Sequence, residues 1–252
     1  MIAFIPARGG SQRVPRKNVR LLAGHPLLAY TIAAAFEAGC FESVCVSTED
    51  REIAAVAESY GAEVIMRPAV YAAHTSCDVE WLRHAIAVPH RQPMGQWAIL
   101  RPTSPFRGAD AIRRAFAAFS VPDGTHDSLR AVRPVSEHPG KMWTWDGPGA
   151  PMRPVFDKKH ADGTPWHSSP TQSLPPMYLQ TGAIEMGWNG NIWARGTIHG
   201  SKVIPFLLED YAALDINSED DWDRAVTLAA ASPALLPAVA LASVSSLAAT
   251  LR

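Results

Sequence analysis

The stretch "IAFIPARGGSQRVPRKN", residues 2–18, decides how this chain begins to fold. It opens as a short apolar run and passes into a loop in which Gly9, Gly10 and Pro15 disfavour a helix. The loop is also strongly basic, with Arg8, Arg13, Arg16 and Lys17, and with Arg20 just beyond it. In a mostly parallel sheet, ligands bind outside the carboxyl ends of the strands. A strand that leads directly into such a loop therefore indicates an anion-binding turn at that edge of a sheet.

Strand-like and helix-like segments alternate outward from this stretch. The expected strands are residues 2–7, 43–48, 62–66, 96–102 and 128–135. The expected helices between them are residues 26–39, which end at Gly39, and then 50–61, 78–88 and 109–119. This repetition predicts an α/β fold, with a mostly parallel sheet and helices on both faces.

Residues 137–176 break the alternation, because they are rich in Pro, Gly and Trp and show no clear period. The segment is longer than the loops that merely connect elements in a compact domain, and it is consistent with a lid, a substrate loop or a dimer arm. Strands are expected again at 177–186 and 202–208, and a last helix at 218–231 with Ser218 as its N-cap. We therefore predict a single domain over residues 1–230 with an insert at about 137–176, and an Ala/Leu-rich tail over 231–252.

Composition narrows the class of protein. The chain has 252 residues, of which 47% are apolar and 19% charged, and its formal net charge is −1. A duplex nucleic-acid binder more often carries a basic surplus, so no nucleic-acid partner is expected. The apolar run at the start is too short for a signal peptide, and no stretch approaches the ~20 apolar residues of a membrane span. The three cysteines, Cys40, Cys45 and Cys77, form no CxxC pair, which favours reduced thiols in a cytoplasmic protein.

The basic loop has a physical explanation as a polyphosphate site. Glycines let backbone N–H groups approach an anion closely, and several cations neutralise a polyphosphate better than a lone carboxylate. The spacing is neither GxxxxGK[ST] nor GxGxxG, which argues against a P-loop and a dinucleotide fingerprint. On charge alone, a solvated basic loop is equally consistent.

The motif "IPARGGSQRVPRKN" (residues 5–18) resembles the N-terminal signature of the acylneuraminate cytidylyltransferase family, which is close to [IL]PARGGSKGIPRKN. Further segments resemble the family in the same order: "VSTED" (46–50), "RP" (67–68), "LRPTSPFR" (100–107), "LQTGAIEM" (179–186) and "LDINSEDDW" (214–222). Together the matches cover most of residues 2–222.

This resemblance implies a Rossmann-like nucleotidyltransferase fold in which the irregular segment is a dimerisation and substrate insert. It implies an enzyme that transfers CMP from CTP to the anomeric hydroxyl of an acidic sugar, a sialic acid-like nonulosonate, with release of pyrophosphate. It further implies a homodimer and a need for Mg²⁺.

The resemblance also implies site residues. Catalytic roles fall on Arg8, Lys17 and Asp215. Nucleotide-binding roles fall on Ala7, Arg8, Gly9, Gly10, Ser11, Arg13, Lys17, Asn18, Arg67, Thr75, Arg101, Thr103 and Ser104. Acceptor-binding roles fall on Lys141, Arg153, Gln172 and Thr181, and the metal pair is Asp215 and Asn217.

Five positions depart from the family pattern: Gln12 replaces a lysine, Arg101 a glutamine, Thr181 an asparagine, Met186 a tyrosine and Asn217 an aspartate. Two alternatives therefore stay open. One is a related nucleotidyltransferase that uses an octulosonate or phosphonate acceptor, or GTP. The other is a non-catalytic nucleotide-binding homologue. Arg107, which closes the "PTSPFR" segment, is equally consistent with a surface ion pair.

Overall fold

The computed structural model describes residues 1–87, 95–121 and 125–242. The chain divides into two compact units. The first, here called the main unit, is Met1–Ala131 together with the chain from Thr181 onward. The second, here called the arm, is Val132–Gln180, and it contains the segment predicted as an insert.

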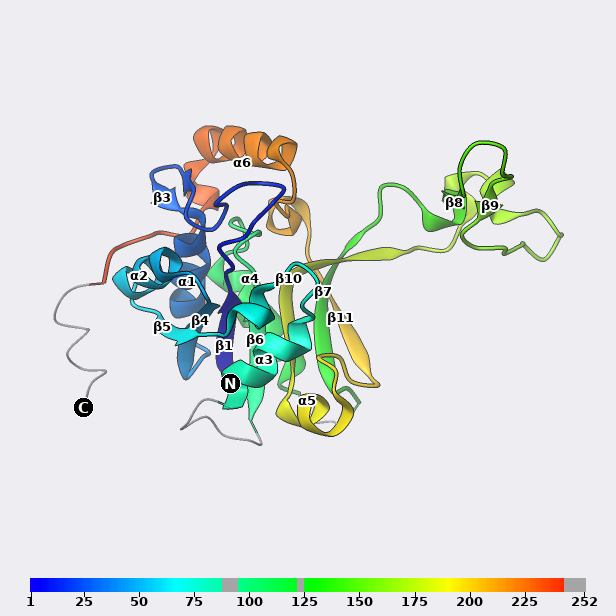
Figure 1. Cartoon of the computed structure of the whole chain (residues 1–252). Helices are drawn as coiled ribbons and strands as arrows, with labels where there is room; N and C mark the ends of the chain where they lie inside the picture. The colour runs from blue at the N-terminus through cyan, green and yellow to red at the C-terminus, as the bar shows by residue number, and fades with distance from the viewer. Residues whose placement is uncertain (88–94, 122–124, 243–252) are drawn as a thin grey trace. The chain divides into compact units, whose positions relative to one another are not determined.

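A seven-stranded sheet forms the centre of the main unit, in the order β11-β7-β10-β6-β1-β4-β5 (Figure 1). Its strands are β1 (Ile2–Pro6), β4 (Ser43–Thr48), β5 (Glu63–Met66), β6 (Gln96–Leu100), β7 (Ser128–Pro134), β10 (Tyr178–Trp188) and β11 (Val203–Leu207). β1 pairs in parallel with β4 and β6, and β4 pairs in parallel with β5, whereas β10 runs antiparallel to β6. The mostly parallel sheet predicted from the alternation is confirmed, with β10 as an antiparallel neighbour.

Helices cover both faces of this sheet. They are α1 (Leu27–Ala38), α2 (Arg51–Ser59), α3 (Asp78–Ala87), α4 (Ala109–Phe119), α5 (Asn189–Arg195) and α6 (Glu219–Ala231). Successive side chains of β1 point to opposite faces, so Ile5 joins the core formed with α1, α2 and α4, while Phe4 joins the core formed with α3 and α5. The prediction of helices on both faces is confirmed.

Shorter elements complete the two units. In the main unit they are β2 (Leu21–Leu22), β3 (His25–Pro26) and the 3₁₀ turns η1 (Ala69–Ala72), η5 (Asp210–Ala213) and η6 (Pro233–Leu235). In the arm they are η2 (Pro139–Lys141), β8 (Trp143–Thr144), β9 (Arg153–Pro154), η3 (Trp166–Ser168) and η4 (Thr171–Ser173). None of the helices in the described ranges combines the length and the apolar character that crossing a bilayer requires.

The capping residues explain several helix boundaries. α1 ends at Ala38 with Gly39 as its C-cap, and α4 covers the predicted residues 109–119. The Asp50 side chain accepts the backbone N–H groups of Glu52 and Ile53 at the start of α2. Ser218 caps α6 as predicted and forms a reciprocal capping box with Asp221.

α6 packs back onto the beginning of the chain. Its buried Trp222 and Ala225 join a cluster with Val14 and Leu22 from the N-terminal loop region. The guanidinium of Arg20 lies 4.2 Å from the Trp222 ring centroid, a cation–π distance. This packing brings the segment that precedes α6 next to the basic loop.

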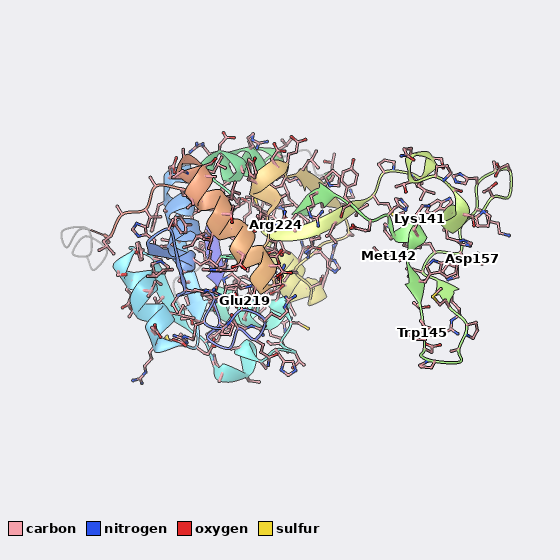
Figure 2. All side chains as sticks on the ribbon, turned by 90° about the horizontal axis from the view of Figure 1, so that it is seen from above. Lys141, Met142, Trp145, Asp157, Glu219 and Arg224 are labelled. Carbon is pink, nitrogen blue, oxygen red and sulfur yellow. The ribbon has the colours of Figure 1, made fainter. Side chains whose placement is uncertain are left out.

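Large apolar side chains are exposed on the arm. Its two-stranded sheet pairs β8 with β9, and Val155 N donates back to Met142 O at 2.9 Å. Trp145 and Met152 are among its most exposed apolar residues, and Figure 2 shows Met142 and Trp145 among the arm's side chains. So short a sheet buries little of its own apolar surface.

Candidate active site

The loop that follows β1 is fastened to the ends of neighbouring strands. Gly9 N donates to Glu49 Oε1 at 2.8 Å, and Glu49 directly follows β4. A Cβ at residue 9 would lie 2.3 Å from Asp50 Oδ2, so any larger residue would displace the carboxylate that caps α2 and pairs with Arg16. The Asn18 amide donates to Arg8 O at 3.0 Å and closes the loop on itself.

Arg16 anchors this loop from outside. Its guanidinium pairs with Asp50 at 2.5 Å and also with Glu52. Burial acts to raise the pKa of Asp50, but hydrogen bonds from Arg16 and from the first turn of α2 lower it overall. The charge of Arg16 is therefore used in holding the loop to α2.

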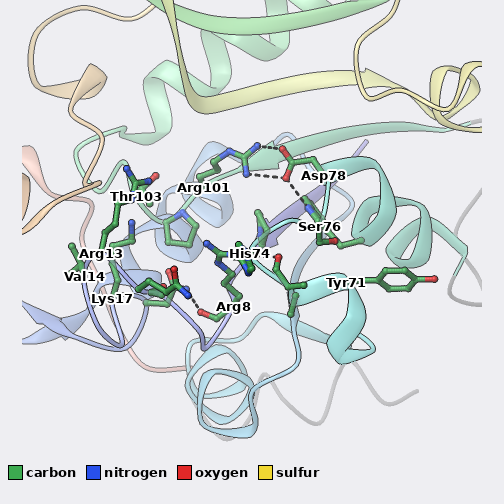
Figure 3. Close-up of a pocket in the computed structure, with 18 of the residues that line it drawn as sticks. Arg8, Arg13, Val14, Lys17, Tyr71, His74, Ser76, Asp78, Arg101 and Thr103 are labelled. Carbon is green, nitrogen blue, oxygen red and sulfur yellow. Dashed lines mark hydrogen bonds and ion pairs between the residues drawn. The ribbon is translucent and has the colours of Figure 1, made fainter. Parts of the chain in front are cut away.

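A pocket of about 440 Å³ opens at the carboxyl ends of β1, β5 and β6 (Figure 3). This volume lies within the range of small-molecule sites. One group of lining residues comes from the basic loop and the segment before α6: Arg8, Ser11, Gln12, Arg13, Val14, Lys17, Asn18 and Asn217. The other comes from the ends of β5 and β6 and from η1 and α3, and it includes Arg67, Tyr71, Ala72, Ala73, His74, Ser76, Asp78, Trp81, Arg101, Pro102 and Thr103.

The loop side of the pocket is cationic. Lys17 Nζ donates to Ile216 O at 2.5 Å, and Arg8 Nη1 lies 3.4 Å from Ala73 O. Burial lowers the pKa of Lys17, and nearby Arg13 and Arg8 lower it further, while Asp215 opposes the shift. Within residues 1–87, 95–121 and 125–242, no ion pair neutralises Arg8, Arg13 or Lys17. These three side chains can therefore bind a multiply charged anion.

The predicted metal pair forms a short chain of hydrogen bonds. Asn217 Nδ2 donates to Asp215 Oδ2 at 2.5 Å, and Arg13 Nη2 donates to Asn217 Oδ1 at 3.0 Å. A guanidinium can only donate and a carboxylate only accept, so the amide oxygen must face Arg13. Asp215 can offer an oxygen to Mg²⁺ in this arrangement, while the oxygen of Asn217 is engaged by Arg13. No cluster of three or more His, Cys, Asp or Glu suited to a metal occurs in the described chain.

Two basic residues, one buried and one partly exposed, organise the opposite side. Arg67, whose side chain is 3% exposed, pairs with Glu49 at 3.3 Å. Burial lowers the pKa of Arg67, and Glu49 opposes that shift. Glu49 thus ties Arg67 to the N–H of Gly9. Arg101, at the end of β6, binds Asp78 Oδ2 at 2.6 Å and Glu185 Oε1 at 2.8 Å.

The pocket brings together nine of the residues predicted for the site: Arg8, Ser11, Arg13, Lys17, Asn18, Arg67, Arg101, Thr103 and Asn217. The others of the main unit lie outside its lining: Ala7, Gly9, Gly10, Thr75, Ser104, Thr181 and Asp215. Thr181 is buried and donates to Ala131 O at 3.3 Å. Lys141, Arg153 and Gln172 belong to the arm, where Arg153 pairs with Asp146.

Sequence reasoning missed Tyr71, His74, Ser76, Asp78 and Trp81, which line the pocket. A usable signal existed, because these residues follow β5, and the carboxyl ends of parallel strands share one edge of the sheet. Arg107, for which a surface ion pair was one reading, is instead fully buried and donates to Ala183 O at 2.6 Å. Burial lowers the pKa of Arg107 from its ordinary value.

A parallel-sheet α/β fold with a cation-lined pocket at the carboxyl edge of its strands defines a nucleotide-binding class of protein. Known structures agree on the fold. CMP:2-keto-3-deoxy-manno-octonic acid synthetase complexed with CTP superposes with a TM-score of 0.66 at 13% identity, covering 92% of this chain and 98% of that one. The 4-diphosphocytidyl-2C-methyl-D-erythritol synthase from Anaerococcus prevotii gives a TM-score of 0.58 at 10% identity, covering 90% of this chain and 94% of that one.

Sequence comparison identifies the family. A cytidylyltransferase profile matches residues 2–83. The CMP-N,N'-diacetyllegionaminic acid synthase of Legionella pneumophila is 32% identical, over 88% of this chain and 93% of its own length. The pseudaminic acid cytidylyltransferase of Campylobacter jejuni is 33% identical, over 90% of this chain and 95% of its own length. The N-acylneuraminate cytidylyltransferase of Escherichia coli is 29% identical over 90% of this chain, which spans only 52% of that longer protein. The chain belongs to the cytidylyltransferase family that contains these proteins.

Proposed function

We propose that the chain transfers CMP from CTP to the anomeric hydroxyl of an acidic sugar, a sialic acid-like nonulosonate, and releases pyrophosphate. The observation that carries this proposal is the pocket beside β1, in which Arg8, Arg13 and Lys17 form no ion pair within the described chain. The relatives support the same reaction, because one is named a CMP-N,N'-diacetyllegionaminic acid synthase and another a pseudaminic acid cytidylyltransferase.

The protein's part in this reaction is to orient and to stabilise charge. The sugar hydroxyl attacks the α-phosphorus of CTP and gives up its proton to solvent. The bond between the α-phosphorus and the oxygen that bridges it to the β-phosphorus breaks, and pyrophosphate leaves with the negative charge. Arg8 and Lys17 stabilise that charge, because they are held in place before the substrate arrives. The loop fixed by Glu49 and Asn18 holds the triphosphate in line with the incoming hydroxyl.

Mg²⁺ is proposed as the cofactor, with Asp215 as its single protein carboxylate. Bound Mg²⁺ neutralises phosphate charge, and it typically takes one or two carboxylates together with substrate phosphate oxygens. Asn217 would contribute an oxygen only if it released Arg13, so Asp215 would be the main protein ligand, beside phosphate oxygens and water.

The arm is proposed to bind the acceptor and to join two chains as a homodimer. Arg153 and Lys141 are its candidate partners for the sugar carboxylate, with Gln172 as a polar contact. Its exposed Trp145, Met152 and other apolar side chains support a second copy of the chain as partner. Sedimentation of the whole chain should give a dimer mass, and Trp145→Asp should shift it towards monomer; a monomeric wild type would contradict the dimer.

A pyrophosphate-release assay tests the function. The four nucleoside triphosphates are each incubated with Mg²⁺ and with sialic, legionaminic, pseudaminic and octulosonic acids. We expect release with CTP and one of the three nonulosonates, and none without the sugar. Arg8→Ala should abolish this turnover, and Arg114→Ala, a change in an exposed ion pair on α4, should not. Release with GTP alone, or with the octulosonate alone, would contradict the proposal.

A further inference from the structure

A chain of four charged groups runs from the sheet to the wall of the pocket. Arg130 on β7 pairs with Glu185 Oε2 on β10 at 2.7 Å, and Glu185 Oε1 pairs with Arg101 at 2.8 Å. Both terminal nitrogens of Arg101 donate to Asp78, Nη1 to Oδ1 at 3.3 Å and Nη2 to Oδ2 at 2.6 Å. Two cations and two carboxylates balance one another, which is how charges tolerate burial.

This network leaves Arg101 unable to turn towards an anion in the pocket. Its inner partner Glu185 is only 1% exposed, and losing Arg101 would leave a half-paired buried charge there. The backbone also closes on the guanidinium, because a Cβ at Gly182 would lie 3.0 Å from Arg101 Nε. Burial acts against the charge, but Glu185 and Asp78 raise the pKa of Arg101 overall. Arg101 therefore acts on Asp78, and the nucleotide-binding role that the family resemblance implied for it would be exerted through that carboxylate.

Asp78 is the member of the network that can meet a ligand. It lines the pocket, its side chain is 33% exposed, and it stands at the first residue of α3. The two oxygens of a carboxylate accept about four hydrogen bonds. Three are taken, two by Arg101 and one by Trp81 Nε1 at 2.9 Å, so Oδ2 keeps one acceptor position. Burial acts to raise the pKa of Asp78, but Arg101 and Trp81 lower it overall, which keeps the group an acceptor.

The charges of the pocket orient a nucleotide. A polyphosphate is attracted to Arg8, Arg13 and Lys17 and is repelled by the carboxylate of Asp78. The base is the end of a nucleotide that lies farthest from its terminal phosphates. The pocket lining also includes the apolar residues Ala72, Ala73 and Pro102, whose surfaces suit a flat ring.

We infer that Asp78 is a specificity-determining residue, whose carboxylate accepts a hydrogen bond from the exocyclic amine of cytosine. Arg101, held by Glu185 and Arg130, is the positioning residue that aims this carboxylate. Uracil carries a carbonyl oxygen where cytosine carries the amine, so this oxygen would face the carboxylate of Asp78 with no hydrogen between them. A site built to accept a hydrogen bond from its substrate rejects such an analogue strongly. This inference rests on the proposed use of CTP.

Equilibrium binding of CTP, UTP and inorganic tripolyphosphate, measured by calorimetry, tests the role of Asp78. Wild type should prefer CTP to UTP. Asp78→Asn should weaken CTP roughly ten- to a hundredfold, the usual range for a hydrogen bond to a charged group, and should not weaken UTP. Tripolyphosphate has no base, so its affinity should not fall.

Asp110→Asn is the matched control, because Asp110 lies in the first turn of α4 and its exposed side chain pairs with Arg114. It should leave all three affinities unchanged. If Asp78→Asn does not fold, Asp78→Glu, which moves the carboxylate by one methylene, should also reduce the preference for CTP. An equal loss for CTP and UTP, or a matching loss for tripolyphosphate, would overturn the inference by showing a structural or phosphate-side role.

Arg101→Gln tests the positioning role separately. It keeps the carboxylate of Asp78 but removes the fork that holds it, so the ratio of CTP to UTP affinity should fall while tripolyphosphate affinity stays constant. An unchanged ratio of CTP to UTP affinity would show that Arg101 does not position Asp78. The proposed function is tested separately, because it requires pyrophosphate release. If wild type prefers CTP but releases no pyrophosphate, only the proposed function is contradicted. If wild type turns over but Asp78→Asn keeps the ratio of CTP to UTP affinity, only the inference about Asp78 is contradicted.

Discussion

At the scale of single residues, burial lowers the pKa of Lys17. Its ammonium is desolvated between the loop and Ile216, and Arg8 and Arg13 add repulsion, so its pKa is lowered. A lowered pKa means that the positive charge disappears at a lower pH than in an ordinary lysine. The affinity for a triphosphate should therefore fall as the pH rises through that lowered value.

The dissociation constant of CTP, measured from neutral to alkaline pH, checks this effect. Wild type should lose affinity by up to about tenfold per pH unit once Lys17 begins to deprotonate. Lys17→Arg keeps its charge throughout, because a guanidinium does not titrate in this range, so its profile should be flat. A wild-type profile as flat as that of the arginine variant would contradict the role of Lys17.

Asn217 leaves Asp215 as the single carboxylate of the proposed metal pair. Asn217→Asp would place a second acid next to Asp215, still within reach of Arg13. Two adjacent carboxylates repel each other and attract a divalent cation, so the Mg²⁺ concentration for half-maximal turnover should fall severalfold. Asn217→Ala adds no charge and should not lower it. An unchanged Mg²⁺ requirement in Asn217→Asp would place residue 217 away from the metal.

Single residues also mark the limit of what the sequence predicts about the site. Arg8, Arg13 and Lys17 could be found because they follow one strand in one motif. The pairing of Arg101 with Asp78 and Glu185 joins residues 23 and 84 positions away along the chain, and no local pattern records such contacts. The sequence therefore indicated Arg101 as a nucleotide contact and gave no sign of Asp78 as its partner.

At the scale of elements, local chemistry explains which boundaries were predictable. Asp50 and Ser218 satisfy free N–H groups at the starts of α2 and α6, and both helices follow their N-caps directly. α5 was not predicted, because it begins "NGN", a sequence of poor helix formers, and is held by the burial of Ile192. Tertiary packing overrode propensity there.

The cap of α6 links stability to the site. The Ser218 hydroxyl accepts Asp221 N at 3.2 Å, and Asp221 Oδ2 in turn accepts the N–H of Asn217 at 2.9 Å. Ser218→Ala should lower the free energy of unfolding by about 1 kcal/mol, the usual cost of a lost N-cap. It should also raise the KM for CTP, because it loosens the segment that carries Asp215.

Chemical denaturation and steady-state kinetics measure the two effects of Ser218→Ala. Ser232→Ala, at the other end of α6, is the control, because the side chain of Ser232 makes no capping bond to that helix. It should change neither quantity appreciably. A Ser218→Ala variant with wild-type stability would show that the capping box contributes nothing in solution.

At the scale of the whole molecule, the arm is an insertion between two neighbouring strands. The chain leaves the main sheet through β7 and returns through β10, which adjoin in the strand order. Val135 N donates to Met177 O at 3.1 Å, so the two ends of the insertion lie side by side. A segment whose ends are joined in this way adds length without interrupting the sheet, and its lack of period made it visible in the sequence.

Arg153 of the arm is the proposed partner of the acceptor's carboxylate. Arg153 on β9 pairs with Asp146 within the arm, and both side chains are about 60% exposed. Exposed pairs of this kind contribute little to stability, so Arg153→Ala should unfold like wild type. If Arg153 binds the carboxylate of the sugar, its loss should raise the KM for the sugar roughly ten- to a hundredfold, since an arginine fork engages both carboxylate oxygens. The KM for CTP should not change.

Steady-state kinetics of Arg153→Ala with each substrate varied in turn show whether the KM for the sugar or the KM for CTP is raised. Asp146→Asn is the matched control: it releases Arg153 from its partner within the arm but keeps the guanidinium. Because a freed guanidinium no longer has to break an ion pair to bind the acceptor, Asp146→Asn should leave the KM for the sugar unchanged or lower it. A higher KM for the sugar in Asp146→Asn as well would mean that the pair itself shapes the arm. A defect of Arg153→Ala confined to CTP would assign this arginine to the nucleotide and leave the acceptor's carboxylate without its proposed partner.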